Sequence, residues 1–290
     1  MRLAPVALLA AALTGGPGCA TDAGRGADLV PATGLSHYRF DAPSGRWTLP
    51  DELAEVSGLV DDGEGGLLAH HDNGAALWRL APGATLEIVA VPGAPGPPGD
   101  FEGLARRGDA LWLLGSPGLV YRATLSPGGT TAWRQATVLR GVCGFEGIET
   151  APDGGLLLAC KYPRAPRTGH VLLVRVAADA AQSEVLAIDV APVLNATGLR
   201  RLRPSGLAWL PARAGRAGGA PARLLVLAGK ERVLLEVDAE AGRLLAWRRL
   251  LRARHRQAEG IAVLADGAIV IADEADGRAA TLTRYAPAPP

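Results

Sequence analysis

The chain has 290 residues and a net charge of +1 at pH 7, from 30 basic and 29 acidic side chains. Its positive charges are spread along the sequence, apart from Arg248-Arg249 and the stretch Arg252 to Arg256, so nothing in it predicts binding to nucleic acid. The expected partner is therefore a small ligand or another protein of the same compartment.

The first 19 residues predict an export signal. Arg2 is followed by the apolar run Leu3 to Leu13 and then by small residues up to Cys19, which is the basic, apolar and small-residue order of a signal peptide. The apolar run is too short to span a bilayer as a mature helix. The small residues before Cys19 indicate a bacterial lipoprotein signal with Cys19 lipidated. Ordinary secretion is the alternative, because Gly16 stands where such signals usually have Leu.

Residues 20–35 are rich in Gly, Ala and Asp and predict a flexible tether. Residues 36–290 then form a single domain, which we expect to be a monomer. Such a protein would be lipid-anchored in the bacterial cell envelope, facing the periplasm or the cell surface, with no other membrane contact. A soluble periplasmic or secreted protein is the alternative.

A short phrase recurs five times along the rest of the chain. Its copies are Ser57-Gly58-Leu59, Glu102-Gly103-Leu104, Glu146-Gly147-Ile148, Ser205-Gly206-Leu207 and Glu259-Gly260-Ile261. Self-similarity at a period of roughly 40 to 50 residues predicts a repeat architecture, in which each unit needs its neighbours to bury its apolar face.

Each phrase opens a unit of short strands. In the last unit, Glu259 to Val263 and Ala268 to Ala272 are apolar strands joined by the turn Asp266-Gly267, and Thr281 to Tyr285 is a third strand. Asp-Gly between two apolar runs is a hairpin signal, because Gly adopts the positive φ that tight turns require. Each unit therefore predicts an antiparallel meander of three or four strands.

These strands favour an all-β fold, a β-propeller, over helical repeats. Runs such as Leu111 to Leu114 are too short for the helices of an α-solenoid. About five blades of four antiparallel strands fill the chain from Leu53 onward, and six blades are the alternative. Because the last unit ends after its third strand, we expect an N-terminal strand, His37 to Phe40 or Arg46 to Leu49, to complete it and close the ring.

Two cysteines remain after Cys19. Cys143 and Cys160 lie on the first and second strands of one predicted blade. In an oxidising compartment they could form a disulfide. The alternative is a pair of buried thiols, because cysteine packs well as a small hydrophobe.

The glutamates of the phrase are candidate metal ligands. The first strand of each blade lines the channel of a propeller, so Glu102, Glu146 and Glu259 should approach one another near its axis. Like charges at close range raise each other's pKa, and a divalent ion would relieve the repulsion. Carboxylate oxygens suit Ca²⁺ or Mg²⁺ better than Zn²⁺. Alternatively, these glutamates accept hydrogen bonds from backbone amides of the next blade and hold the blades together.

A second polar layer follows the second strands and is expected at one mouth of the channel. It comprises His70 to Asn73, Ser116, Lys161, Lys230-Glu231 and Asp273-Glu274. His71 could be a metal ligand, a general base or a turn residue, and Asp72 beside it is a stronger functional candidate. The candidate catalytic residues are His71, Asp72, Lys161 and Lys230.

The ordered set of phrases resembles the SdiA-regulated family of bacterial envelope proteins. The resemblance covers about Leu53 to Tyr285 and rests on Glu55 to Leu59, His71 to Asn73, Asp100 to Gly103, Gly144 to Ile148, Pro204 to Leu207, Gln257 to Ile261 and Ala272 to Glu274. It implies a five-bladed propeller distantly related to NHL-repeat propellers, with a calcium site and no established activity. The implied ligands are Glu102, Glu146, Glu259, Asp72, Asp273 and Glu274. Ser116-Pro117 stands where the family usually has Asp-Glu, and Lys161-Tyr162 stands where Lys-Glu is usual.

Two functions remain open. The first is a propeller that binds calcium in or near its channel and acts as a ligand- or protein-binding module of the envelope. The second is a calcium-dependent hydrolase of phosphoesters, lactones or esters, by analogy with phytase-like and lactonase-like propellers. In it Lys161 or Lys230 would stabilise negative charge, and Asp72 or His71 would act as base. The sequence has no Gly-x-Ser-x-Gly and no His-Glu-x-x-His, so the binding module is favoured.

Overall fold

The computed structural model describes residues 34–93, 96–139, 141–164, 167–179, 183–210 and 223–288. The signal segment 1–19 with Cys19, and the tether up to residue 33, lie outside the described residues. No helix in the described ranges is long and apolar enough to cross a membrane. The structure places Gly34 and Leu35 in a short 3₁₀ helix, Gly34–His37, that belongs to the folded domain.

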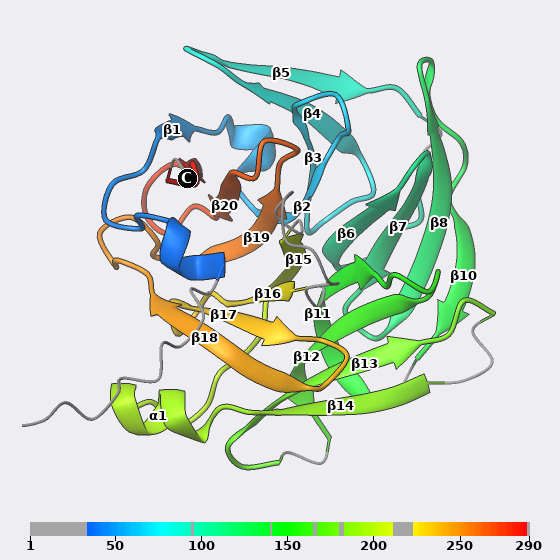
Figure 1. Cartoon of the computed structure of the whole chain (residues 1–290). Coiled ribbons are helices and arrows are strands. Elements are labelled where there is room, and N and C mark those ends of the chain that lie inside the picture. The colour runs from blue at the N-terminus through cyan, green and yellow to red at the C-terminus, as the bar shows by residue number, and fades with distance from the viewer. Residues whose placement is uncertain are drawn as a thin grey trace, which may run out of the picture. The chain divides into compact units, whose positions relative to one another are not determined.

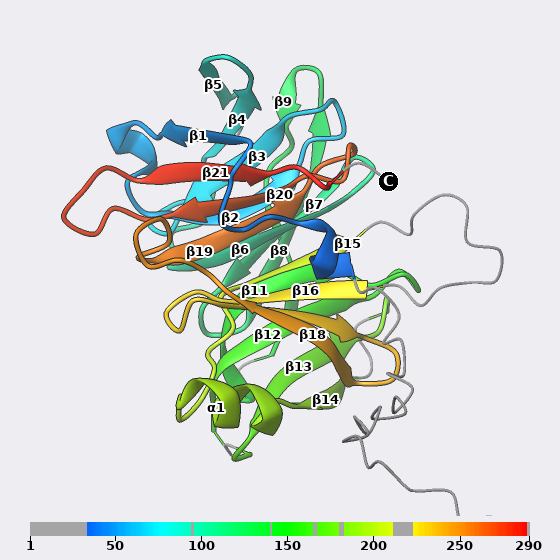
Figure 2. The same ribbon diagram turned by 60° about the vertical axis from the view of Figure 1, so that its left-hand side comes forward.

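The described residues form a five-bladed β-propeller, which confirms five blades rather than six. Each blade is an antiparallel sheet whose innermost strand is β2, β6, β11, β15 or β19. Neighbouring innermost strands contact one another in a closed ring, and Figure 1 shows them gathered around the centre. Figure 2 shows the strands of a blade lying side by side.

The blades are numbered in chain order and their strands are given from the innermost outward. Blade 1 is β2 to β5 (Val56–Asp61, Leu67–His71, Leu77–Pro82, Leu86–Val91), and blade 2 is β6, β7, β8 and β10 (Phe101–Arg107, Ala110–Gly115, Leu119–Ser126, Arg134–Val138) with β9 (Gly129–Thr130) paired to β8. Blade 3 is β11 to β14 (Cys143–Thr150, Leu156–Pro163, His170–Val176, Ser183–Asp189), and blade 4 is β15 to β18 (Gly206–Leu210, Arg223–Ala228, Val233–Asp238, Arg243–Arg249). Blade 5 is β19, β20, β21 and β1 (Ala258–Val263, Ile269–Asp273, Thr281–Tyr285, Gly45–Thr48).

The N-terminal strand β1 closes the ring, as the missing fourth strand of the last unit predicted. It pairs with β21 over Gly45–Thr48, so the second of the two candidate segments supplies the strand. Trp47 on β1 donates its indole N–H to the carbonyl of Gly83 in blade 1, at 3.2 Å. The last blade is thereby tied to the first.

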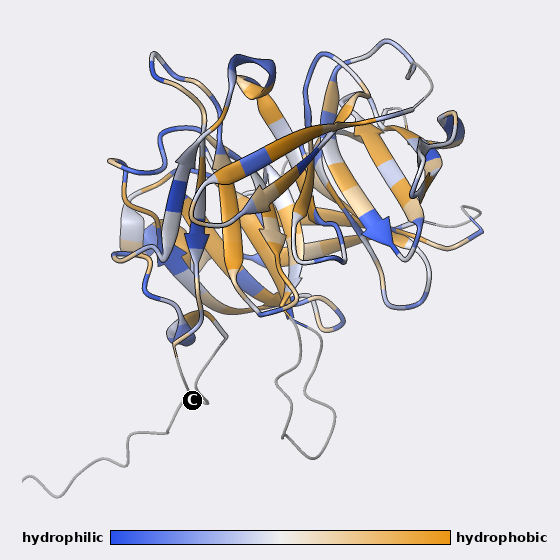
Figure 3. Cartoon of the chain, turned by 90° about the horizontal axis from the view of Figure 1, so that it is seen from above, coloured by the Kyte–Doolittle hydropathy of each residue, from blue (hydrophilic) through white to orange (hydrophobic). Residues whose placement is uncertain are grey.

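The core lies between the blades. One cluster packs Leu157 and Leu173 of blade 3 against Leu224 and Leu235 of blade 4, all fully buried, and similar clusters fill the other blade interfaces. Figure 3 shows apolar colour along the inner strands and polar colour mainly in the connections. Each blade therefore buries its faces only against its neighbours.

Two short helical segments flank the blades, and one buried carboxylate contacts the N-terminal segment. The helix α1 (Ala191–Thr197) follows blade 3, and a 3₁₀ turn, Asp51–Leu53, precedes blade 1. Glu236 of β17 is fully buried and accepts hydrogen bonds from the backbone N–H groups of Gly34 and Leu35, both at 2.9 Å. Arg223 pairs with the same carboxylate at 2.5 Å, so the N-terminal segment is fixed to blade 4.

Cys143 of β11 and Cys160 of β12 form a disulfide between the two inner strands of blade 3. Both residues are buried. Of the two alternatives left open by the sequence, the structure therefore contains the bridged pair.

Candidate functional site

The repeated phrase lies at a β-bulge at the start of the innermost strand. In blades 1, 2, 3 and 5 the strand register shifts at Ser57, Glu102, Glu146 and Glu259. In blade 4, Ser205 immediately precedes β15 and donates its N–H to Leu227 O, the residue that also pairs with Gly206. A bulged residue leaves the ladder and its side chain is re-aimed, so we call Ser57, Glu102, Glu146, Ser205 and Glu259 the bulge positions.

A second set of equivalent positions follows the second strands. The glycine after each bulge pairs with a residue of the second strand. The residue two positions further along directly follows the end of that strand in blades 1, 2, 4 and 5 and lies within β12 in blade 3. We call these the exit positions, and in blades 1 to 5 they are Asp72, Ser116, Lys161, Gly229 and Glu274. Side chains alternate along a strand, so the exit positions share the orientation of the pairing residue, toward the bulge.

The two sets together carry five carboxyl groups and one ammonium. The carboxyls are Glu102, Glu146, Glu259, Asp72 and Glu274, and the ammonium belongs to Lys161. All are half-buried or buried. This surplus of acidic groups over a single cation is the main electrostatic property of the channel mouth.

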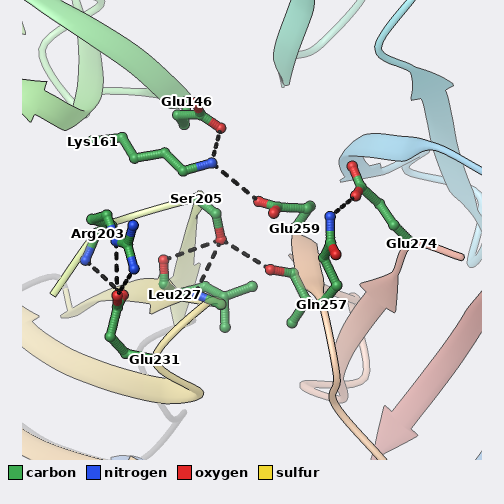
Figure 4. Close-up of polar contacts among 11 residues, drawn as sticks. Glu146, Lys161, Arg203, Ser205, Leu227, Glu231, Gln257, Glu259 and Glu274 are labelled. Atoms are coloured by element: carbon green, nitrogen blue, oxygen red, sulfur yellow. Dashed lines mark hydrogen bonds and ion pairs between the residues drawn. The ribbon is translucent and has the colours of Figure 1, made fainter. Parts of the chain in front are cut away.

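Lys161 is the centre of the cluster. Its Nζ lies 2.6 Å from Glu146 Oε2 and 4.0 Å from Glu259 Oε2, and the three side chains are only 12%, 10% and 13% exposed. Burial opposes the charge of Lys161, yet the carboxylates of Glu259 and Glu146 raise its pKa above the usual value. Figure 4 shows the three side chains pointing toward one another.

Glu102 and Glu146 form a pair of interacting carboxyls. Burial, the negative charge of Glu146 and a hydrogen bond to it raise the pKa of Glu102 to about 9. Glu102 is therefore protonated at neutral pH and can donate to Glu146, which in turn pairs with Lys161. A carboxylic acid held neutral at pH 7 is a feature of binding and catalytic sites.

The blade 5 carboxyls are also hard to ionise. Burial raises the pKa of Glu259 to about 7, with Lys161 opposing and Glu146 adding to the shift. Burial and the neighbouring Glu259 raise the pKa of Glu274 to about 8. Gln257 donates its side-chain N–H to Glu274, and this contact orients the carboxyl (Figure 4).

Asp72 lies at the exit of blade 1. Burial and the adjacent Glu55 raise its pKa, and its Oδ1 is buried without a hydrogen-bond partner among the described residues. The neighbouring His71 is used in the turn, because its Nδ1 accepts the N–H of Asn73 at 3.0 Å and its ring packs against Trp78. His70 is fully buried, and this burial lowers its pKa to about 4.

Asp273 does not share this orientation. It lies one residue before the exit position of blade 5, so strand alternation turns its side chain the other way. Its Oδ2 lies 2.8 Å from His255 Nδ1, and His255 Nε2 lies 2.6 Å from the hydroxyl of Tyr285. The three side chains form a buried group outside the Lys161 cluster.

Lys230 also differs from Lys161. The register aligns Gly229 with Lys161, and Lys230 with Tyr162. Lys230 is exposed, and the channel-facing lysine among the described residues is Lys161. Glu231, the residue after Lys230, is buried. It accepts three hydrogen bonds of 2.6 to 2.9 Å from Arg203.

The alternative role for the phrase glutamates, holding neighbouring blades together, is filled largely by the backbone. Phe101 N donates to Asp72 O at 2.7 Å, and Phe145 N donates to Ser116 O at 3.2 Å. Between blades 4 and 5, the hydroxyl of Ser205 bonds Ala258 O at 3.2 Å. The glutamate side chains are thereby left for contacts with one another and with Lys161.

The six predicted calcium ligands do not converge on one point. No group of three or more His, Cys, Asp or Glu side chains among the described residues is arranged to hold a metal ion. Asp273 turns toward His255, and the ammonium of Lys161 lies where a metal ion would meet Glu146 and Glu259. As arranged here, the residues fit an ammonium group better than calcium, and the calcium site stays a prediction.

Sequence reasoning missed several members of the polar network: Gln257, Arg203, Asp100, Glu55 and the pair His255 and Tyr285. It also missed Glu149 at the opposite ends of the inner strands, where a cavity of about 370 Å³ opens and burial raises the pKa of Glu149 to about 7. Gln257 could have been found, because it stands two residues before a phrase, as Asp100 does.

No family model and no curated protein sequence matches the chain. Solved structures are similar to it in fold. One is the glutaminyl cyclase of Myxococcus xanthus, with a TM-score of 0.56 and 14% identity over 86% of this chain and 97% of that chain. Another is the PQQ-bound aldose sugar dehydrogenase of Streptomyces coelicolor, with a TM-score of 0.50 and 15% identity over 84% and 99% of the two chains. At such identities the similarity shows the fold alone. The fold and the comparisons together define the chain as a β-propeller.

Proposed function

We propose that the chain is a ligand-binding propeller of the bacterial cell envelope whose acidic channel mouth takes a cationic group, and that this group is an organic ammonium. The observation that carries the proposal is the ratio of five carboxyls to one ammonium at the bulge and exit positions. Lys161 illustrates the recognition, because its own ammonium lies 2.6 Å from Glu146. Charge-assisted contacts of this kind are the strong hydrogen bonds of proteins.

The raised pKa values of Glu102, Glu259 and Glu274 support this proposal. Burial is the largest cause of these shifts, and neighbouring carboxylates add to them. A second cation at the mouth would favour the ionised carboxyls and would release protons as it binds. The groups proposed to meet it are Glu259, Glu274 and Asp72, whose Oδ1 lies 3.9 Å from His71 Nδ1 and accepts no hydrogen bond among the described residues.

The first experiment is a titration of residues 20–290 with spermidine and, separately, with Ca²⁺, by calorimetry in two buffers of different ionisation heat. We expect saturable spermidine binding with proton release, and its loss in a Glu259→Gln/Glu274→Gln variant. The matched control, Glu87→Gln/Glu184→Gln, changes exposed glutamates of outer strands. Stoichiometric Ca²⁺ without amine binding would instead support the calcium prediction, and binding of neither would contradict a cation site.

Export is part of the proposal and has its own support. The order of residues up to Cys19 is that of a lipoprotein signal, and a disulfide such as Cys143–Cys160 persists in oxidising compartments. Mass spectrometry of the mature N-terminus tests it. A diacylated Cys19 is the expected result, and an intact Met1 in a cytoplasmic fraction would contradict it.

A second candidate function is hydrolysis, and one observation favours it. Glu102, with a pKa of about 9, can serve as a general acid beside the ion pair of Lys161 and Glu146, while Glu259, with a pKa of about 7, can accept a proton. A screen of phosphoesters and lactones tests this function. An activity that Glu102→Gln abolishes, with the fold intact, would favour the enzyme over the binding module.

A further inference from the structure

A pocket beside blade 5 adjoins the channel mouth at Glu274. It has a volume of about 380 Å³ and is lined by β1, by the start of β21 and by the loops that flank β19 and β20, within the size range of small-ligand sites. Four arginines line it, Arg46, Arg254, Arg256 and Arg278, together with the carboxyls of Asp273, Glu274 and Asp276. Such a concentration of guanidinium groups favours an oxyanion, which arginine binds in a bidentate manner.

Two of the arginines have contacts of their own. Arg254 donates to the carbonyls of Phe40 and Asp41, and Arg256 pairs with Asp276 at 3.3 Å. Within the described residues, Arg46 and Arg278 form no hydrogen bond or ion pair. Their guanidinium groups are therefore available to a ligand.

Asp273 gives the pocket an acidic wall. Its side chain is 5% exposed and lines the pocket. His255 binds Oδ2, while Oδ1 is buried with no partner among the described residues. A buried carboxylate oxygen without a donor is costly, so a ligand that supplies a donor to this atom would be stabilised.

A cationic donor suits Asp273 Oδ1. His255 contacts Oδ2 and the hydroxyl of Tyr285 and leaves Oδ1 without a donor. An ionised donor makes a stronger hydrogen bond to a carboxylate than a neutral donor does.

We propose that this pocket binds a small zwitterion, whose ammonium donates to Asp273 Oδ1 and whose oxyanion, a carboxylate or a phosphate, is held by Arg46 and Arg278. Lys161, Glu146 and Glu259 do not line this pocket, whereas Glu274 of the channel mouth does. The two sites therefore adjoin at Glu274, and the contacts proposed here are those of Asp273, Arg46 and Arg278 alone.

The test compares zwitterions with molecules that carry one of the two charges. β-Alanine and O-phosphoethanolamine are titrated against residues 20–290 by calorimetry and ligand-observed NMR, with ethylamine, propionate and inorganic phosphate as single-charge probes. We expect saturable binding of at least one zwitterion, about tenfold or more tighter than any single-charge probe. The zwitterion that binds more tightly identifies the oxyanion.

Variants assign the two ends of the ligand. Asp273→Asn and Arg46→Ala/Arg278→Ala should each weaken the zwitterion by about tenfold or more, and Asp273→Asn should leave inorganic phosphate unaffected. The arginine variant changes exposed side chains, so we expect it to fold. It therefore tests the pocket even where Asp273→Asn does not fold. Arg134→Ala/Arg200→Ala, at exposed positions outside the pocket, and Glu259→Gln, which changes a channel-mouth residue that does not line the pocket, should leave the affinity for the zwitterion unchanged.

Three results would overturn the proposal: no saturable binding of either zwitterion, equal binding of a single-charge probe, or equal affinity of the arginine variant and its control.

Discussion

Lys161 of blade 3 reaches across the channel to Glu259 of blade 5, with 4.0 Å between Nζ and Oε2. The two residues lie on strands that do not pair, and the lysine also bonds Glu146 of its own blade. The ammonium of Lys161 therefore offsets the negative charge of carboxylates from two different blades.

Lys161→Met should lower the free energy of unfolding at pH 8 by about 3 kcal/mol, because removing one member of a buried ion pair leaves the other charge without compensation. The loss should be smaller at pH 5, where Glu259, with a pKa of about 7, is protonated. Urea denaturation at both pH values measures the difference. Lys230→Met is the matched control, since Lys230 is exposed, and should change stability by less than about 0.5 kcal/mol. Equal losses in the two variants would contradict the role of Lys161.

Stability should fall as the pH rises from about 5 to 9. The pKa values of Glu102, Glu259 and Glu274 are raised to about 9, 7 and 8 by folding, so across this range the folded state binds more protons than the unfolded state. The free energy of unfolding then decreases with pH. Thermal melts at five pH values test the trend.

Glu102→Gln should flatten that pH profile. The amide resembles the protonated acid that Glu102 forms at neutral pH, so the variant should melt at a higher temperature than the parent at pH 9 and near the parent value at pH 5. Glu87→Gln, which changes an exposed glutamate of β5, is the control. A variant that is destabilised equally at both pH values would show that Glu102 is needed as a carboxylate.

Reduction of the Cys143–Cys160 disulfide should destabilise the domain by about 3 kcal/mol, the value for a closed loop of this size, since the cysteines are separated by 17 positions in sequence. Denaturation of the parent with and without reductant measures the loss. Cys143→Ala/Cys160→Ala should lose a similar amount and become insensitive to reductant. Stability that reductant leaves unchanged would argue against the bond in solution.

Glu236→Ala should cost about 3 kcal/mol, because it removes the buried partner of Arg223 and of two backbone N–H groups. It should also release the segment around Leu35 to proteases, which limited proteolysis with N-terminal sequencing detects. Glu240→Ala, at an exposed position of the following turn, is the control. Equal cleavage of both variants would show that Glu236 does not hold the N-terminus.

The architecture was predictable because the repeated phrase coincides with a local structural need. A glycine follows each bulge, and a Cβ on Gly147 would meet Gly206 Cα of the next blade at 3.1 Å. Close approach of the inner strands therefore selects glycine in every blade. Closure by the N-terminus also followed from the sequence, since the last unit lacked a fourth strand.

The acidic cluster was predictable in part. The glutamates were found because they stand in the phrase, but which of two neighbouring exit residues faces the channel depends on strand register. A shift of one residue reverses the face, and this separates Glu274 from Asp273 and Lys161 from Lys230. Contacts between blades, such as Lys161 with Glu259, join residues far apart in sequence and carry no local signal.

Closure of the ring by β1 has a consequence for how the chain folds. Ser44 bonds the backbone carbonyl of Arg284, 240 residues further along, so the fifth blade needs both ends of the domain. The first four blades are local meanders and can form in order as the chain emerges, but the ring stays open until the last strand is present. Contacts of such long range make folding slow. A chain shortened before Thr281 would keep four blades and lose the closed ring.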